Sequence, residues 1–294
     1  MKKLKGVIQA MTTPFTADEQ LDLNAISEQV EFAIKNKIDC LYPTGTTGEM
    51  YLMSCEEREA VAEKVVATAN GRVTVYIHVG AMTQSDTIRL AKHAEKIGAD
   101  GIGVVTPSYF GVSDKAMVKY YEAICQSVSE DFPVYAYSIP QLAKNDLSVE
   151  VLNSIVSTCK NLVGIKYSFP DFRKLMAYMT VNNGNFSVLF GGDDMFLPAL
   201  VAGAEGVVSG CSNPFPELFS NIYDSYKKGD LKKALEQQRY ANEVIFLMKS
   251  GADMSIFKNI MKWRGINAGY MRAPLPNLSE SDMEKLYEDI KKYL

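Results

Sequence analysis

The feature that most constrains the fold of this chain is a regular series of short apolar runs between residues 6 and 209. Eight runs of strand length are present: Gly6–Met11, Asp39–Pro43, Val73–Val79, Gly101–Thr106, Val134–Ile139, Leu162–Tyr167, Ser187–Phe190 and Gly206–Ser209. These runs are apolar almost throughout, without the alternation of a half-exposed strand, so we expect them to be buried on both faces. Strands of this kind are typical of parallel sheets covered by helices.

Helical segments separate most of the runs. Apolar residues recur at helical spacing, as at Ile26, Val30 and Ala33 before the second run. Ser54 and Ser148 are each followed by acidic residues within one turn, which is a typical signal for the start of a helix. The order of elements is therefore a strand followed by a helix, repeated along the chain.

Eight such units predict an α/β fold, a (β/α)8 TIM barrel formed by residues 1–225. A faint internal repeat supports this, since Gly98–Gly103 and Gly203–Val208 both place a glycine and an acidic turn before a strand. An open doubly wound sheet would favour a glycine fingerprint after the first strand, where Thr12–Phe15 stands instead. Residues 226–294 are expected to form a C-terminal helical extension, with helices over Asp230–Ser250, Met254–Trp263 and Ser281–Tyr293.

Composition excludes several classes of function. With 31 basic and 35 acidic residues the net charge is -4, and no basic block is present, so nucleic acid is not an expected partner. No apolar run approaches the roughly 18 residues of a membrane span. The two histidines, His78 and His93, cannot supply a multi-histidine metal site, and we expect no metal and no cofactor.

The cysteines and the N-terminus bear on the compartment. Five scattered cysteines without a C-x-x-C pair are expected to be buried, reduced residues of a cytoplasmic protein. The apolar stretch Gly6–Met11 is too short for the core of a signal peptide.

Candidate chemistry lies at the carboxyl ends of the strands, where a parallel barrel has its active site. The second run ends in Gly45-Thr46-Thr47-Gly48-Glu49, where glycines permit a tight turn and amides and hydroxyls can bind an anion such as a carboxylate. A plain turn with threonine caps would use the same residues, and the turn alone does not decide between the two.

Lys166 interrupts the sixth apolar run. Burial of an ammonium group is costly unless it is paired or neutral, and a neutral lysine amine is a nucleophile that can form a Schiff base with a ketone. The alternative is that Lys166 ends the strand and reaches solvent or an acid. Tyr137 on the fifth run could move a proton or bind a substrate, and Tyr109 after the fourth run could do the same, although buried tyrosines usually belong to the core.

The seventh run ends in Gly191-Gly192-Asp193-Asp194. The glycines permit close approach of a ligand to the backbone, and the two acids could accept hydrogen bonds from substrate hydroxyls. We expect a core or surface role for His78 and His93.

Together these elements resemble the dihydrodipicolinate synthase/N-acetylneuraminate lyase superfamily of Schiff-base aldolases. The matching motifs are Thr13-Pro14-Phe15, Gly45–Glu49, His78-Val79-Gly80, Thr106-Pro107 with Tyr109, Tyr137–Pro140, Gly164-Ile165-Lys166 and Gly191–Asp194. The resemblance implies that Lys166 forms an imine with pyruvate or another 2-oxo acid, that Tyr137 is the proton shuttle, assisted by Thr46 and Tyr109, and that the chain is a homotetramer. The substrate-binding set that it implies is Thr46, Thr47, Leu142, Ser168, Gly191, Asp193, Asp194, Val208 and Gly210.

Within this superfamily the residues favour an N-acetylneuraminate lyase or related sugar-acid aldolase. Leu142 stands where dihydrodipicolinate synthases carry an arginine, although Lys144 could replace it, and Ser168 and Asp193-Asp194 match the lyases. Three residues depart from the lyase pattern, namely Ser138, Gly192 and Gly210, so the aldehyde pocket is altered. The alternatives are a dihydrodipicolinate synthase, a sugar-acid dehydratase, a metal-dependent aldolase and a non-catalytic barrel that senses a 2-oxo acid.

Overall fold

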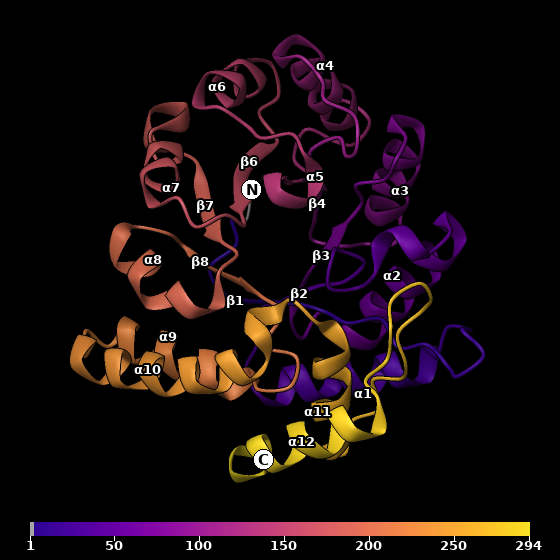
Figure 1. The fold of residues 1–294 in the computed structure, drawn as a ribbon. Helices are drawn as coiled ribbons and strands as arrows, with labels where there is room; N and C mark the ends of the chain where they lie inside the picture. Colours follow the sequence, from indigo (N-terminus) through magenta and orange to yellow (C-terminus); the bar gives the residue numbers. More distant parts are fainter. Residues whose placement is uncertain (1–2) are drawn as a thin grey trace.

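Eight parallel strands close into a barrel around which the helices are arranged (Figure 1). The structure is a computed structural model that describes residues 3–294. Each strand pairs with its neighbours in chain order, and β1 also pairs with β8, with Val7 opposite Val207. The strands are β1 Gly6–Ala10, β2 Cys40–Tyr42, β3 Thr74–His78, β4 Gly101–Val105, β5 Val134–Ser138, β6 Leu162–Tyr167, β7 Ser187–Phe190 and β8 Gly206–Ser209. The predicted TIM barrel and its eight strands are confirmed. The alternative prediction of an open doubly wound sheet is wrong.

Helices follow the strands and cover the outside of the barrel (Figure 1). They are α1 Leu23–Lys35, α2 Cys55–Ala69, α3 Gln84–Lys96, α4 Asp114–Cys125, α5 Pro140–Ala143, α6 Val149–Thr158, α7 Phe172–Tyr178, α8 Phe196–Ala202, α9 Pro216–Lys227, α10 Leu231–Leu247, α11 Met254–Trp263 and α12 Glu280–Ile290. Ser54 caps α2 with a complete capping box, and Ser148 caps α6, as their sequence signals predict.

The amino end of the barrel interior is filled. Ile8, Tyr76, Tyr135 and Leu189 pack together there, and the Tyr135 hydroxyl accepts a hydrogen bond from the Leu4 amide at 2.8 Å. Burial raises the pKa of Tyr135 to about 12. Because this end is packed with side chains, a substrate can enter the barrel only from the carboxyl end.

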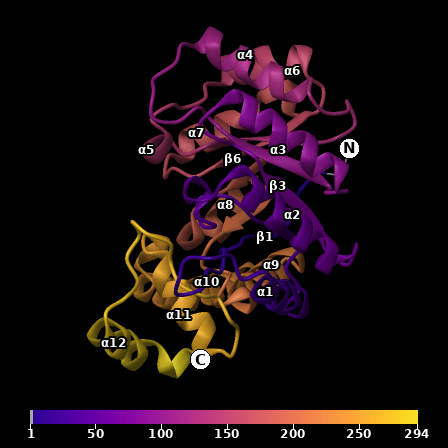
Figure 2. The same cartoon turned by 90° about the vertical axis from the view of Figure 1, so that its right-hand side faces the viewer.

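The C-terminal helices lie at that carboxyl end. Figure 2 shows them on the same side of the barrel as α5, with the N-terminus on the opposite side. Tyr270, beyond α11, pairs with Phe15 in the loop after β1 through an isolated bridge. The division at residue 225 stays a prediction, and α9 runs across that position.

Among the cysteines, Cys40, Cys125, Cys159 and Cys211 are buried as predicted, whereas Cys55 is half-exposed at the start of α2. Within residues 3–294, none of the helices combines the length and the apolar character needed to cross a bilayer.

Candidate active site

A cavity of about 530 Å³ opens at the carboxyl end of the barrel. Strands or the loops after them supply most of its lining, which is Ala10, Thr46, Thr47, Tyr137, Ile139, Gln141, Leu142, Lys166, Ser168, Gly191, Asp193, Val208, Gly210, Ser250, Gly251, Ala252, Met254 and Phe257. Of the predicted site residues, Thr46, Thr47, Tyr137, Leu142, Lys166, Ser168, Gly191, Asp193, Val208 and Gly210 therefore meet in one cavity. A second cavity of about 510 Å³ is lined by residues of the C-terminal helical segment alone, and it includes none of them.

Lys166 lies on β6 with only 7% of its surface exposed. Within residues 3–294 it forms no ion pair, and its Nζ lies 4.0 Å from the centroid of the Tyr137 ring and 5.6 Å from that of Tyr42. The faces of these rings carry negative potential and stabilise a cation without accepting its protons. The amine is therefore held beside the cavity with its lone pair or protons available to a ligand.

Tyr137 is the direct neighbour of Lys166 across the β5–β6 pair. Its hydroxyl lies 3.4 Å from the Thr46 Oγ1, a long contact in which either oxygen can donate. His78 packs edge-on against the Tyr137 ring, with 6.0 Å between centroids. The three side chains Thr46, Tyr137 and Lys166 thus form a continuous row along the cavity wall.

His78 is fully buried, so of the two roles expected for it, core or surface, it has the core role. Burial, followed by the positive charges of Arg58 and Lys166, holds the pKa of His78 well below its usual 6.5. A neutral imidazole is therefore the stable form beside Tyr137. The other histidine, His93, lies on α3 and contacts Glu63 Oε1 at 3.0 Å, away from the cavity.

The turn after β2 contributes Thr46 and Thr47 to the cavity lining. The amides of Gly48 and Glu49 donate within the turn, to Gly45 O and Thr46 O, whereas those of Thr46 and Thr47 donate to no acceptor in residues 3–294. Two free amides with two hydroxyls beside them form a concave donor set that suits a carboxylate.

The cavity lining also contains an acid, Asp193. Asp193 Oδ2 accepts a hydrogen bond from the Cys211 amide at 3.2 Å, and its buried Oδ1 has no partner in the described chain. Desolvation is the main cause that raises the pKa of Asp193 above 3.8. Because the protein covers Oδ1, this oxygen could accept a hydrogen bond from a ligand hydroxyl only after the Asp193 side chain turns toward the cavity.

Two glycines fit the shape of this pocket. A Cβ on Gly191 would lie 1.9 Å from the Ser168 Oγ and 2.8 Å from the Ser168 Cβ, so a larger residue at 191 requires Ser168 to shift. A Cβ on Gly210 would lie 3.1 Å from the Phe257 ring and 3.4 Å from the Thr47 Oγ1. Gly210 therefore lies in a tight space between Phe257 and Thr47.

The structure does not bring two predicted residues to this cavity. Tyr109 is 72% exposed, has a φ of 71° and packs against Phe110. Asp194 is absent from the lining, and its carbonyl accepts a hydrogen bond from Asn242 Nδ2. Lys144, which could have replaced the missing arginine, is exposed and also lies outside the lining.

Sequence reasoning missed one side of the cavity. Gln141 lines it and donates from Nε2 to Ser168 O at 2.7 Å, and it could have been found because it directly follows the Tyr137–Pro140 motif. Ser250–Ala252, Met254 and Phe257 come from the C-terminal segment, and no strand-end pattern marks them.

Comparisons with known proteins agree with this geometry. Residues 3–293 match the model of the Dihydrodipicolinate synthetase family. An uncharacterised DapA-like lyase of Halobacterium salinarum is 34% identical, with 98% of this chain and 93% of that protein covered. An N-acetylneuraminate lyase of Mediterraneibacter gnavus is 30% identical, with coverages of 98% and 92%. The crystal structure of dihydrodipicolinate synthase from Aquifex aeolicus superposes with a TM-score of 0.93 at 30% identity, covering 99% of this chain and 98% of that one.

These matches confirm the resemblance inferred from the sequence. The chain belongs to the dihydrodipicolinate synthetase family, whose members are aldolase-type carbon–carbon lyases that act through a lysine Schiff base.

Proposed function

We propose that Lys166 forms an imine with C2 of pyruvate or another 2-oxo acid. The observation that carries this proposal is the arrangement of one buried, acid-free lysine beside two free amides in the same cavity. Thr46 and Thr47 bind the carboxylate of the oxo acid and thereby present its carbonyl carbon to the amine. Tyr137 stands next to both and exchanges protons with the reacting atoms.

The reaction follows from these positions. The neutral Lys166 amine attacks C2, and the carbinolamine loses its hydroxyl as water with the proton of the Tyr137 hydroxyl, which gives a protonated imine and a tyrosinate. In the cleavage direction the C3–C4 bond breaks, its electron pair moves into the enamine, and the C4 hydroxyl gives its proton to the tyrosinate as the aldehyde forms. C3 then takes this proton from Tyr137, and water hydrolyses the imine and returns a proton to the tyrosinate, which releases the oxo acid and restores the amine.

The aldehyde partner in this proposal is neutral and polyhydroxylated, as in an N-acetylneuraminate lyase or another sugar-acid aldolase. The lining contains Lys166 as its cation and Asp193 as its acid, so the aldehyde end offers acceptors for hydroxyls. A second carboxylate, as in a dihydrodipicolinate synthase reaction, would meet Leu142 at the rim. A sugar-acid dehydratase would use the same imine but expel water instead of an aldehyde.

Borohydride reduction in the presence of pyruvate, followed by peptide mass spectrometry, tests the imine. We expect one reduced pyruvyl adduct, on Lys166, and none in Lys166→Ala. Lys258 is an internal control, because it is buried outside the cavity. Absence of the adduct, or an equal adduct in Lys166→Ala, would refute the mechanism, whereas an adduct without turnover on any aldehyde would favour the sensor.

Asp193→Ala tests the sugar assignment. We expect its KM for a sugar acid to rise about tenfold, corresponding to about 1.4 kcal/mol of lost binding, while the pyruvate adduct still forms. The matched control is Asp194→Ala, which lies outside the lining and should leave this KM unchanged. Loss of the pyruvate adduct in Asp193→Ala, or an equal KM in the two variants, would show that Asp193 does not bind the aldehyde partner.

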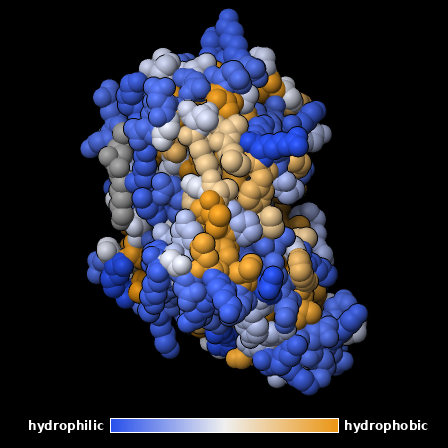
Figure 3. Space-filling view, turned by 90° about the vertical axis from the view of Figure 1, so that its left-hand side faces the viewer, coloured by the Kyte–Doolittle hydropathy of each residue, from blue (hydrophilic) through white to orange (hydrophobic). Residues whose placement is uncertain are grey.

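The proposed assembly is a homotetramer, and two exposed apolar surfaces support it. Tyr109 and Phe110 are 72% and 70% exposed on the loop after β4. Figure 3 shows an apolar band on the side of the molecule that carries α7 and α8. Met176 of α7 and Val201 of α8 are exposed. The proposed compartment is the cytoplasm, supported by five cysteines that form no disulfide within residues 3–294.

A further inference from the structure

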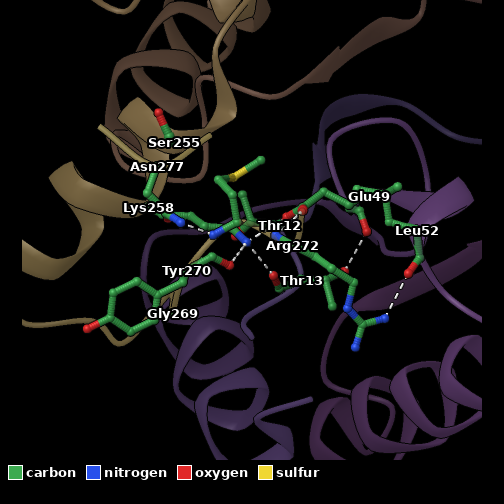
Figure 4. Close-up of polar contacts among 12 residues, drawn as sticks. Thr12, Thr13, Glu49, Leu52, Ser255, Lys258, Gly269, Tyr270, Arg272 and Asn277 are labelled. Carbon is green, nitrogen blue, oxygen red and sulfur yellow. Dashed lines mark hydrogen bonds and ion pairs between the residues drawn. The ribbon is translucent and has the colours of Figure 1, made fainter. Parts of the chain in front are cut away.

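A second buried lysine lies outside the cavity, at the junction of three distant segments. Lys258 of α11 is 2% exposed and donates from Nζ to Glu49 Oε1 at 2.6 Å, to Thr13 O at 2.7 Å and to Tyr270 O at 2.5 Å. Figure 4 shows these acceptors converging on the ammonium group from the loop after β1, the turn after β2 and the C-terminal segment. All three of its protons are therefore used.

Glu49 is the residue through which this junction reaches the active site. It directly follows the Thr46-Thr47-Gly48 turn, has a left-handed φ of 60°, and its amide donates to Thr46 O at 3.0 Å. A left-handed conformation is unfavourable for a glutamate and persists only where its surroundings hold it. The ion pair with Lys258 is a contact that can hold it.

Arg272 makes a second set of contacts with the same turn. The Arg272 amide donates to the other oxygen, Glu49 Oε2, at 3.0 Å, and its guanidinium donates to Leu52 O at 2.7 Å (Figure 4). The guanidinium also pairs with Glu57. The guanidinium also lies 4.1 Å from the centroid of the Phe15 ring. The C-terminal segment therefore holds both Glu49 and the short helical turn that follows it.

Stability alone does not account for this arrangement. A buried ion pair replaced by apolar residues of similar volume often costs nothing, because desolvation offsets much of the attraction. Burial lowers the pKa of Lys258 even though Glu49 acts in the opposite direction. Unlike an apolar contact, the ion pair fixes the orientation of the Glu49 carboxylate, because each of its oxygens accepts from a different donor.

We propose that Lys258 and Glu49 are positioning residues, and that their buried ion pair sets the turn on which Thr46 and Thr47 present their free amides. The carboxylate site then depends on α11, which also supplies Met254 and Phe257 to the cavity lining. This inference rests on the proposed function for its kinetic consequence, although the placement of the turn can be tested without any ligand.

The test compares Lys258→Met and Glu49→Gln with Ile260→Ala. Ile260 is fully buried on the same helix, so its truncation destabilises α11 through a cavity but leaves the ion pair intact. The first measurement is hydrogen exchange of the peptide spanning residues 43–53. The second is the pyruvate concentration that gives half-maximal borohydride trapping on Lys166.

In Lys258→Met we expect faster hydrogen exchange in this peptide, and we expect the half-saturating pyruvate concentration to rise by about ten- to a hundredfold. Glu49→Gln should change both quantities in the same direction by a smaller amount. Ile260→Ala should change neither, even at an equal loss of melting temperature. Glu49→Gln decides the matter if Lys258→Met does not fold. Unchanged exchange in the foldable variants, or equal effects in Ile260→Ala, would overturn the proposal. Wild type that forms no adduct would refute the proposed function, and the exchange measurement would still decide the positioning role.

Discussion

Lys166 and Lys258 are both buried, and their surroundings are opposite. Lys258 has a carboxylate and two carbonyls around its ammonium group, whereas Lys166 faces two tyrosine rings and an open cavity. Lys258 is therefore structural, because each proton of its ammonium group has an acceptor. The Lys166 amine has no such acceptor among the described residues and is available to a ligand. The partners of a buried lysine, more than the extent of its burial, indicate its role.

Substituting both lysines by the same residue should separate the two roles most strongly. We expect Lys166→Met to lower turnover by about 10⁴-fold or more, because the nucleophile is lost. Its stability should not fall, because a buried amine without a carboxylate partner in residues 3–294 is replaced by an apolar side chain of similar length. Steady-state kinetics measure the loss of turnover, and thermal unfolding measures stability. A large loss of melting temperature would show that Lys166 makes contacts that stabilise the folded chain.

Tyr137→Phe tests whether the Tyr137 hydroxyl transfers protons during turnover. The ring 4.0 Å from Nζ remains, whereas the hydroxyl and its contact with Thr46 are removed. Turnover should fall by about 10²- to 10⁴-fold, as for the loss of a general acid–base, while pyruvate is still trapped on Lys166. Tyr135→Phe is the control, since that hydroxyl lies at the packed end of the barrel. Equal losses in both variants would mean that packing, and not proton transfer, explains the effect.

Lys258→Met should show the reverse of Lys166→Met. Removing one partner leaves Glu49 buried without its counter-charge, so unfolding free energy should drop by about 3–5 kcal/mol. The double variant Glu49→Gln/Lys258→Met should recover part of that loss in denaturant unfolding, because it no longer buries an unpaired charge. Additive effects of the two substitutions would indicate that the pair is not coupled.

The smallest expected effect is a pH dependence from His78. Because its pKa is depressed on folding, the unfolded chain takes up a proton near pH 6.5 that the folded chain does not, so stability falls as the pH falls below 6.5. The slope is at most about 1.4 kcal/mol per pH unit. His78→Gln should remove this component, and His93→Gln should keep it. Since Lys166 contributes to the depression, Lys166→Met should weaken it and Lys258→Met should not.

Most of the fold could be predicted because parallel strands covered by helices on the outside are continuous apolar runs in the sequence. The strand-end residues Thr46, Tyr137, Lys166 and Asp193 could be placed together for the same reason, since a closed parallel barrel brings all its carboxyl ends to one face.

Residues governed by tertiary contacts could not be placed in this way. Met254 and Phe257 have ordinary helical spacing, and only the return of the chain across the barrel brings them to the cavity. Tyr109 follows a strand as Thr46 does, yet its left-handed backbone directs the loop outward. The pairing of Lys258 with Glu49 joins residues too far apart for any local pattern to indicate.

The contact between Gly191 and Ser168 restricts the order in which this pocket can change. A side chain at position 191 would overlap the Ser168 Oγ at 1.9 Å, so each of the two positions limits what the other tolerates. A larger residue at 191 would also lie 2.8 Å from the Ser168 Cβ and 3.1 Å from its Cα, so it needs a change of the side chain at 168 together with a shift of the backbone there. Single-site libraries at position 191 are therefore expected to yield few active variants, and new specificities at this end of the pocket should appear as paired substitutions.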